Sequence, residues 1–92
     1  MSEVINHLER EVDATDRAQA QAVALCRRMA GMGHDLKTPL NAIMGYTELL
    51  LEEFEEVGAA DKVADLRKIL RSGSQLLGMI EALVRDAAEA AR

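Results

Sequence analysis

Apolar residues recur at alternating spacings of three and four along the first part of the chain. The series keeps one phase over its whole length and is called the seam below. Its members are Ile5, Leu8, Val12, Thr15, Gln19, Ala22, Cys26, Met29, Gly33, Leu36, Leu40, Ile43, Thr47, Leu50, Phe54 and Val57. A mean period of 3.5 residues is typical of helices that pack as coiled coils. The pattern therefore predicts one long helix that ends at about residue 57.

The seam varies in strength along this first helix. It is strongly apolar from Leu36 onward and weak between Thr15 and Ala22. An interior Gly weakens a helix by about 1 kcal/mol relative to Ala, and an interior Pro removes a backbone hydrogen bond. Two glycines and Pro39 therefore make residues 31–39 the part of the helix that we expect to be softest.

One short break follows, at Val57-Gly58-Ala59-Ala60. Gly58 suits the left-handed conformation that ends a helix, and we expect Asp61 to cap the next one. A second helix is predicted over about residues 61–91. Its apolar stripe consists of Val63, Leu66, Leu70, Gly73, Leu77, Ile80, Val84 and Ala87, flanked at a seven-residue period by Ile69, Leu76 and Leu83. An apolar face of this width is typical of bundle helices.

The short turn at residues 58–60 makes the two helices antiparallel neighbours, so the predicted fold is an all-α hairpin. The second helix then returns to about Cys26 and leaves residues 1–25 without a partner in the chain. A two-helix hairpin also cannot cover its own apolar faces. We therefore expect a homodimeric four-helix bundle, formed by residues 26–92, with residues 1–25 extending from it as a parallel coiled coil.

Composition narrows the functional classes. The 92 residues form one small domain with a formal charge of −5, one Phe, one Tyr and no Trp. The absence of a basic stripe or an aromatic platform argues against nucleic acid as a partner. No apolar run approaches the roughly 18 residues of a membrane span, and no signal-peptide pattern is present, so we expect a cytoplasmic segment without membrane insertion. Cys26 is alone, which excludes an intrachain disulfide and a thiolate metal cluster.

A group of residues with reactive or charged side chains lies within the first helix. His34 is followed by Asp35, and Lys37 and Thr38 come one helical turn later. His34 lies one position off the seam, so it is expected on the flank of the bundle, within reach of solvent and of a partner. A carboxylate that accepts the proton of one ring nitrogen leaves the lone pair of the other free to attack an electrophile. Pro39 leaves the carbonyl of Asp35 unbonded, which favours a bend at this point.

Plainer explanations remain open on the residues alone. A single exposed histidine on a helix is usually a solvated surface residue, and a helical threonine usually bonds its own backbone. A proline inside a helix is mostly a kink without a chemical role. His7 lies off the seam without comparable neighbours, and we assign it no role.

Residues 34–43 read His-Asp-Leu-Lys-Thr-Pro-Leu-Asn-Ala-Ile, which resembles the H-box of sensor histidine kinases. That pattern is His, an acid, Leu, a base, Thr or Asn, Pro, Leu, two variable residues and Ile, and every position fits. Residues 69–80 are similar to the second helix of the same family. The resemblance covers about residues 25–90, and the helix before it is similar to the signalling coiled coils that often precede such domains.

The resemblance implies a dimerisation and histidine-phosphotransfer domain. It makes His34 the phosphoacceptor, which attacks the γ-phosphate of ATP, and Asp35 the base or the residue that orients the ring. Thr38 matches the residue that positions water when the family removes phosphate from its response regulator, and Pro39 matches the kink proline. The family binds ATP and Mg²⁺ in a separate kinase domain. No Gly-rich phosphate loop or Mg²⁺ site is visible before Arg92, so we expect this chain to hold no cofactor and to be inactive alone.

The partners implied are a second copy of the chain, the ATP-binding kinase domain and a response-regulator receiver domain. The receiver is expected to dock on the flank near His34, with Asn41, Gly45 and Glu48 as contact residues. One alternative is a degenerate dimerising helical connector, joined to another output module and without phosphotransfer. Another is a standalone phosphatase that uses Thr38.

Overall fold

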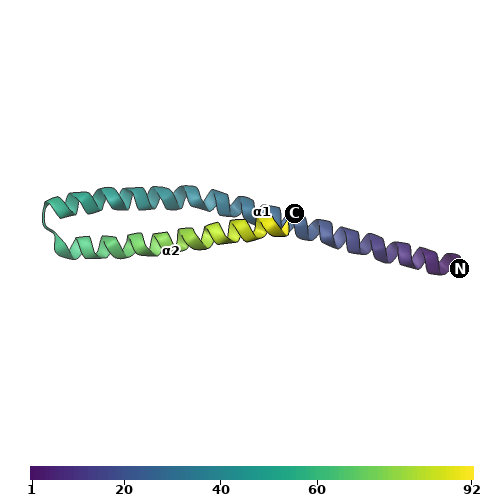
Figure 1. Cartoon of the computed structure of the whole chain (residues 1–92). Helices are drawn as coiled ribbons and strands as arrows, with labels where there is room; N and C mark the ends of the chain where they lie inside the picture. The colour runs from purple at the N-terminus through teal and green to yellow at the C-terminus, as the bar shows by residue number, and fades with distance from the viewer.

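The computed structural model describes residues 1–92 and consists of two helices. Helix α1 spans Ser2–Glu56 and helix α2 spans Ala60–Ala90. They lie side by side and antiparallel, and the N-terminal part of α1 projects beyond the C-terminus of α2 (Figure 1). The molecule measures 84 × 16 × 14 Å. The prediction of an all-α hairpin is confirmed. Neither helix combines the length and the hydropathy that crossing a membrane requires.

The turn between the helices is a Schellman motif. Gly58 adopts a left-handed conformation, with φ 71°. The amide of Ala59 donates to the carbonyl of Phe54 at 3.0 Å, and the amide of Gly58 donates to that of Glu55 at 3.2 Å. These two bonds satisfy carbonyls that the end of a helix leaves free, and only glycine takes this conformation without strain.

The expectation that Asp61 caps α2 is wrong. The N-cap position is held by Ala59, which offers no side-chain hydrogen bond. Asp61 lies instead inside the first turn of α2. A carboxylate there interacts favourably with the positive end of the helix dipole, so the residue still suits the helix start although it does not cap it.

The two helices meet along faces that follow the predicted period. All eight residues of the predicted α2 stripe are buried or half-buried. The matching face of α1 repeats at three and four residues and consists of Val23, Cys26, Ala30, Gly33, Lys37, Leu40, Met44, Thr47, Leu51 and Phe54. Alternate members of the seam therefore contact α2.

Two glycines let the helices approach closely. A Cβ atom at Gly33 would run into Cγ2 of Val84, and a Cβ atom at Gly73 would lie 3.1 Å from Cγ of Met44. Each helix thus supplies one notch that a side chain of the other helix fills. Gly33 directly precedes His34, so the tightest of these contacts lies beside the predicted phosphoacceptor.

The other members of the seam remain open to solvent. Met29, Leu36, Ile43 and Leu50 are exposed, and no side chain of the chain is fully buried. The accessible surface is 7288 Å², whereas a compact protein of this mass exposes about 5,300 Å². The hairpin alone therefore does not close a hydrophobic core.

Candidate functional site

His34 lies on one side of the hairpin, in a row of polar residues that we call the polar flank. On α1 this row repeats every seven residues as His34, Asn41, Glu48 and Glu55, and on α2 as Arg67, Ser74 and Glu81. Two ion pairs join the helices along this side. Glu55 meets Arg67 at 3.2 Å, and Lys37, adjacent to the α1 row, meets Glu81 at 3.9 Å. Polar side chains of both helices therefore share this flank.

The imidazole of His34 is exposed and makes no hydrogen bond or ion pair within the chain. Asp35 follows it about 100° around the helix, and no bond joins the two side chains. Helix α1 runs without interruption through the exposed Pro39. The kink at Pro39 stays a prediction.

The hydroxyl of Thr38 differs from those of the other threonines in the chain. Thr15 and Thr47 donate to the carbonyl oxygens of Glu11 and Ile43, four residues earlier, at 2.9 and 2.7 Å. The Thr38 hydroxyl makes no such bond and lies exposed one turn from His34. It therefore remains free to bind a water molecule or an incoming group on the same side of the helix.

Lys37 and Glu81 are the residues near His34 for which the sequence analysis assigned no role. The side chain of Lys37 is 30% exposed and that of Glu81 is 53% exposed. An antiparallel hairpin that turns at Gly58 places Glu81 opposite Lys37, because the two residues are about equally far from the turn. The position of Glu81 opposite Lys37 could therefore have been predicted from the sequence. No three His, Cys, Asp or Glu side chains come together in a way that would hold a metal ion.

The opposite side of the hairpin is apolar and is called the apolar flank. It consists of the exposed seam residues Met29, Leu36, Ile43 and Leu50 of α1, together with Ile69, Leu76 and Leu83 of α2. A depression between the helices on this side is lined by Ile43, Ile69 and Leu76, among others. Such a surface suits insertion of apolar side chains from another helix pair.

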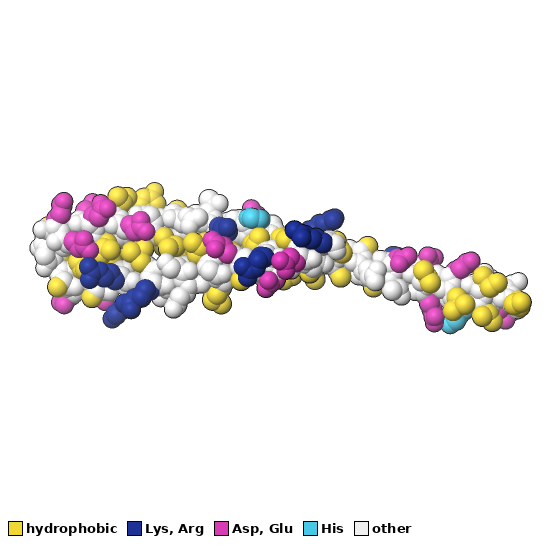
Figure 2. All heavy atoms as spheres, in the orientation of Figure 1, with side chains coloured by type: hydrophobic (Ala, Val, Ile, Leu, Met, Phe, Trp, Pro, Cys, Tyr) yellow, Lys and Arg dark blue, Asp and Glu magenta, His cyan; other side chains and the backbone are white.

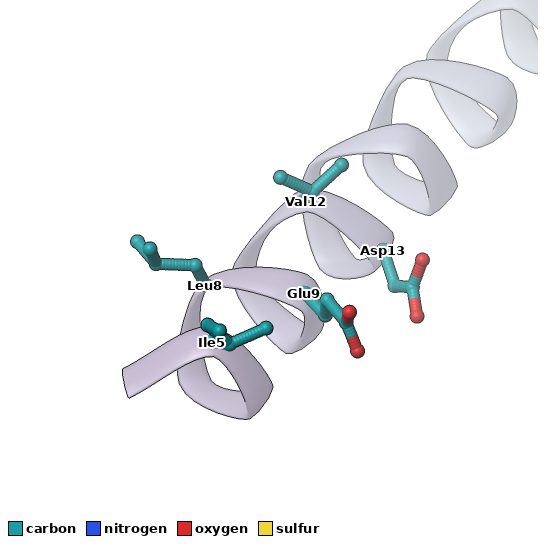
Figure 3. Close-up of a pocket in the computed structure, with 5 residues that line it drawn as sticks. All are labelled: Ile5, Leu8, Glu9, Val12 and Asp13. Carbon is teal, nitrogen blue, oxygen red and sulfur yellow. The ribbon is translucent and has the colours of Figure 1, made fainter. Parts of the chain in front are cut away.

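The projecting part of α1 carries further depressions of the same kind. One is lined by Ile5, Leu8, Glu9 and Val12, with Asp13 at its edge (Figure 3). The next is formed by Leu8, Glu11, Val12, Thr15 and Asp16. Four residues at positions i, i+3, i+4 and i+7 make the hole that receives one side chain of a partner helix in a coiled coil. Figure 2 shows hydrophobic side chains gathered at this end of the molecule.

Comparison with known proteins supports the assignment of the H-box. The chain belongs to the His Kinase A (phospho-acceptor) domain family, which it matches over residues 24–88. This match confirms the family that the H-box indicated and makes the chain a phosphoacceptor and dimerisation domain of the histidine kinase type. No solved structure matches the chain.

Among curated proteins the chain is similar to the cell-division control histidine kinase PdhS of several Brucella species. It is 38% identical to the protein of Brucella anthropi over 71 residues, which is 75% of the chain. It is 41% identical to those of Brucella ovis and Brucella abortus over 58 residues, which is 61% of the chain. The chain spans about 6% of the length of these relatives.

Proposed function

We propose that His34 accepts the γ-phosphoryl group of ATP and passes it to an aspartate of a response-regulator receiver domain. The observation that carries this proposal is the position of His34: its imidazole is exposed on the polar flank, free of bonds within the chain, and stands at the first position of the H-box. A nucleophile that serves two protein partners in turn has to be reachable in this way.

The first transfer is a displacement at phosphorus. A ring nitrogen of His34 forms a bond to the γ-phosphorus, the bond from phosphorus to the bridging oxygen breaks, and ADP leaves with that electron pair. The other ring nitrogen then loses its proton, and we assign its acceptance to Asp35. We assign the binding of ATP and its Mg²⁺ to a separate kinase domain, as the resemblance to sensor histidine kinases implies.

In the second transfer a receiver carboxylate attacks the phosphohistidine, and the N–P bond breaks. The receiver docks on the polar flank. Asn41 and Glu48 lie in the same row as His34, and Gly45 lies beside them with open space around its Cα. Thr38 would position water for removal of phosphate from the receiver, and Pro39 would allow a local bend. These reactions use cytoplasmic ATP, so we assign the segment to the cytoplasm.

The working unit is a homodimer. The single chain exposes about 2,000 Å² more surface than a compact protein of its mass. This difference is larger than the roughly 800 Å² that each partner of a stable complex buries. Pairing of two apolar flanks covers Leu36, Ile43 and Leu76. The two-fold axis runs along the hairpins, because only then do both projecting segments leave the same end of the bundle and bring their apolar holes together.

Phosphotransfer labelling tests the proposal. The chain is incubated with the kinase domain of a histidine kinase and labelled ATP. We expect an acid-labile, alkali-stable label that is lost in His34→Gln and kept in His7→Gln. Absence of label under conditions in which a known phosphoacceptor domain is labelled would contradict the proposal and favour a helical connector.

The role of Thr38 is tested separately. Decay of a phosphorylated receiver is followed with and without the chain. We expect faster decay with the chain and a return to the intrinsic rate with Thr38→Ala. An equal decay rate with the Thr38→Ala variant would remove this residue from the reaction.

A further inference from the structure

Lys37 is the charged residue that lies one helical turn from His34, beyond the adjacent Asp35. Four residues lie one turn from His34, and two of them, Ala30 and Gly31, carry no functional group. The other two are Lys37 and Thr38. Residues three apart on a helix have Cβ atoms about 5–6 Å apart, and the four-carbon stem of lysine spans this distance easily.

The ammonium of Lys37 is held by α2. Its Nζ atom lies 3.9 Å from Oε1 of Glu81, at the outer limit of an ion pair, and no other interaction holds either group. The Glu81 side chain is more than half exposed, so water screens the pair. Lys37 itself is only 30% exposed, because it lies on the face of α1 that packs against α2. The charge is thus well placed, and its present partner is weak.

We propose that Lys37 binds the phosphoryl group that His34 carries, and that Glu81 holds Lys37 until the phosphoryl group arrives. A phosphoryl group brings close to two negative charges and three acceptor oxygens, whereas Glu81 offers a single charge at a long distance. Lys37 therefore exchanges partners in favour of the phosphoryl group. It remains protonated throughout and contributes charge alone, while the N–P bond forms and breaks at His34.

The inference rests on the proposed function for its biological meaning, but its test does not require a kinase. Phosphoramidate transfers its phosphoryl group to histidine directly: the new N–P bond forms on the imidazole, the N–P bond of the reagent breaks, and ammonia leaves. The full chain with His7→Gln is used so that His34 is the single histidine. The rate of phosphohistidine formation is measured by ³¹P NMR, and circular dichroism checks that each variant is folded.

We expect Lys37→Gln to slow phosphorylation roughly tenfold, the effect of one charge-assisted hydrogen bond. Lys37→Arg keeps the charge and is expected to keep most of the rate. Glu81→Gln is expected to speed the reaction about two- to threefold, because it frees Lys37 from a screened ion pair. The matched control is Glu55→Gln, which removes the acid of the other inter-helix pair far from His34 and is expected to leave the rate unchanged.

The double variant Lys37→Gln with Glu81→Gln decides between two roles of Glu81. If Glu81 acts by holding Lys37, the double variant reacts at the rate of Lys37→Gln alone. An acceleration by Glu81→Gln that persists without Lys37 would show simple charge repulsion and overturn the proposal, as would an unchanged rate in Lys37→Gln. Failure of enzymatic labelling with these chemical results intact would count against the proposed function alone.

Discussion

The two flanks of the hairpin repeat with the same seven-residue period and carry opposite chemistry. On the apolar flank the repeat places Leu36, Ile43 and Leu50 on α1, and the side is open to solvent in a single chain. On the polar flank the same repeat places His34, Asn41 and Glu48. The two rows lie on one helix, so the difference is set by side chains and not by the backbone.

The apolar flank suits a permanent interface between two copies of the chain, and the polar flank suits transient contacts. Exposed leucine and isoleucine side chains in a row favour a partner that never leaves, because each exposure to water costs free energy. A row of polar residues with weak ion pairs can be covered and uncovered at little cost. Under the proposed function, this arrangement would let a dimer stay closed while kinase and receiver domains take turns at His34.

The largest expected effect comes from placing a charge on the apolar flank. Ile43→Lys should destabilise the folded dimer by about 3–5 kcal/mol per copy, the scale of a buried charge without a partner. Its matched control is Asn41→Lys, two residues away on the polar flank. Sedimentation equilibrium and urea unfolding measure both variants. We expect Ile43→Lys to be monomeric or largely unfolded and Asn41→Lys to resemble the unchanged chain.

A dimer of normal stability in Ile43→Lys would contradict the assignment of the apolar flank as the interface. Equal losses in the two variants would mean that the flanks do not differ in burial. Leu36→Ala provides a milder version, for which a loss of about 2–5 kcal/mol is expected if this side chain is buried between two copies.

The next effect in size compares the two glycines that precede His34. Gly31 has open space around its Cα, whereas a Cβ at Gly33 collides with Val84. The valine has little freedom to move away, since its χ1 angle is restricted in a helix. We expect Gly33→Ala to destabilise the chain by about 1–3 kcal/mol through overpacking. Gly31→Ala should stabilise it by up to about 1 kcal/mol through helix propensity.

Urea unfolding followed by circular dichroism measures the two glycine variants at one protein concentration. Opposite signs of the change in the free energy of unfolding are the expected outcome. Stabilisation by both substitutions would show that α2 does not pack closely against Gly33.

A third comparison lies within α1, between the projecting segment and the hairpin. The seam weakens at Gln19, which has no partner in a single chain. Gln19→Leu should stabilise the dimer by about 1.5–3 kcal/mol, the free energy of burying one leucine side chain. The control is Gln21→Leu, which lies off the seam. A similar effect of the two substitutions, measured by thermal unfolding at several concentrations, would exclude a coiled coil over this segment.

The fold could be predicted from the sequence wherever apolar residues follow one period of 3.5 residues. The phase of the seam gave a long α1, and Gly58 gave the turn, because no other residue near it takes a left-handed conformation freely. The cap of α2 was assigned wrongly, since Asp61 suits the first turn as well as the N-cap, and local chemistry does not separate the two positions.

The sequence predicted the position of His34 on a flank but not which seam residues the hairpin itself covers. A seam of period 3.5 points to the centre of a four-helix bundle, so its members divide between the partner helix and the second copy. Gly33 packs against α2, whereas Leu36 does not. The pairing of Lys37 with Glu81 depends on helix rotation as well as register, and side-chain spacing within one helix does not determine that rotation.

The smallest expected effect concerns the second ion pair of the polar flank. Arg67 and Glu55 meet at 3.2 Å with side chains 61% and 47% exposed, so the pair should contribute less than about 1 kcal/mol. A double-mutant cycle of Arg67→Gln and Glu55→Gln, measured by urea unfolding, isolates this interaction from other effects of each substitution. The coupling energy should fall further as salt is raised, since exposed charges are screened. A coupling above 2 kcal/mol that salt leaves unchanged would mean that this flank is held as firmly as the apolar one, and the contrast between a permanent and a transient surface would fail.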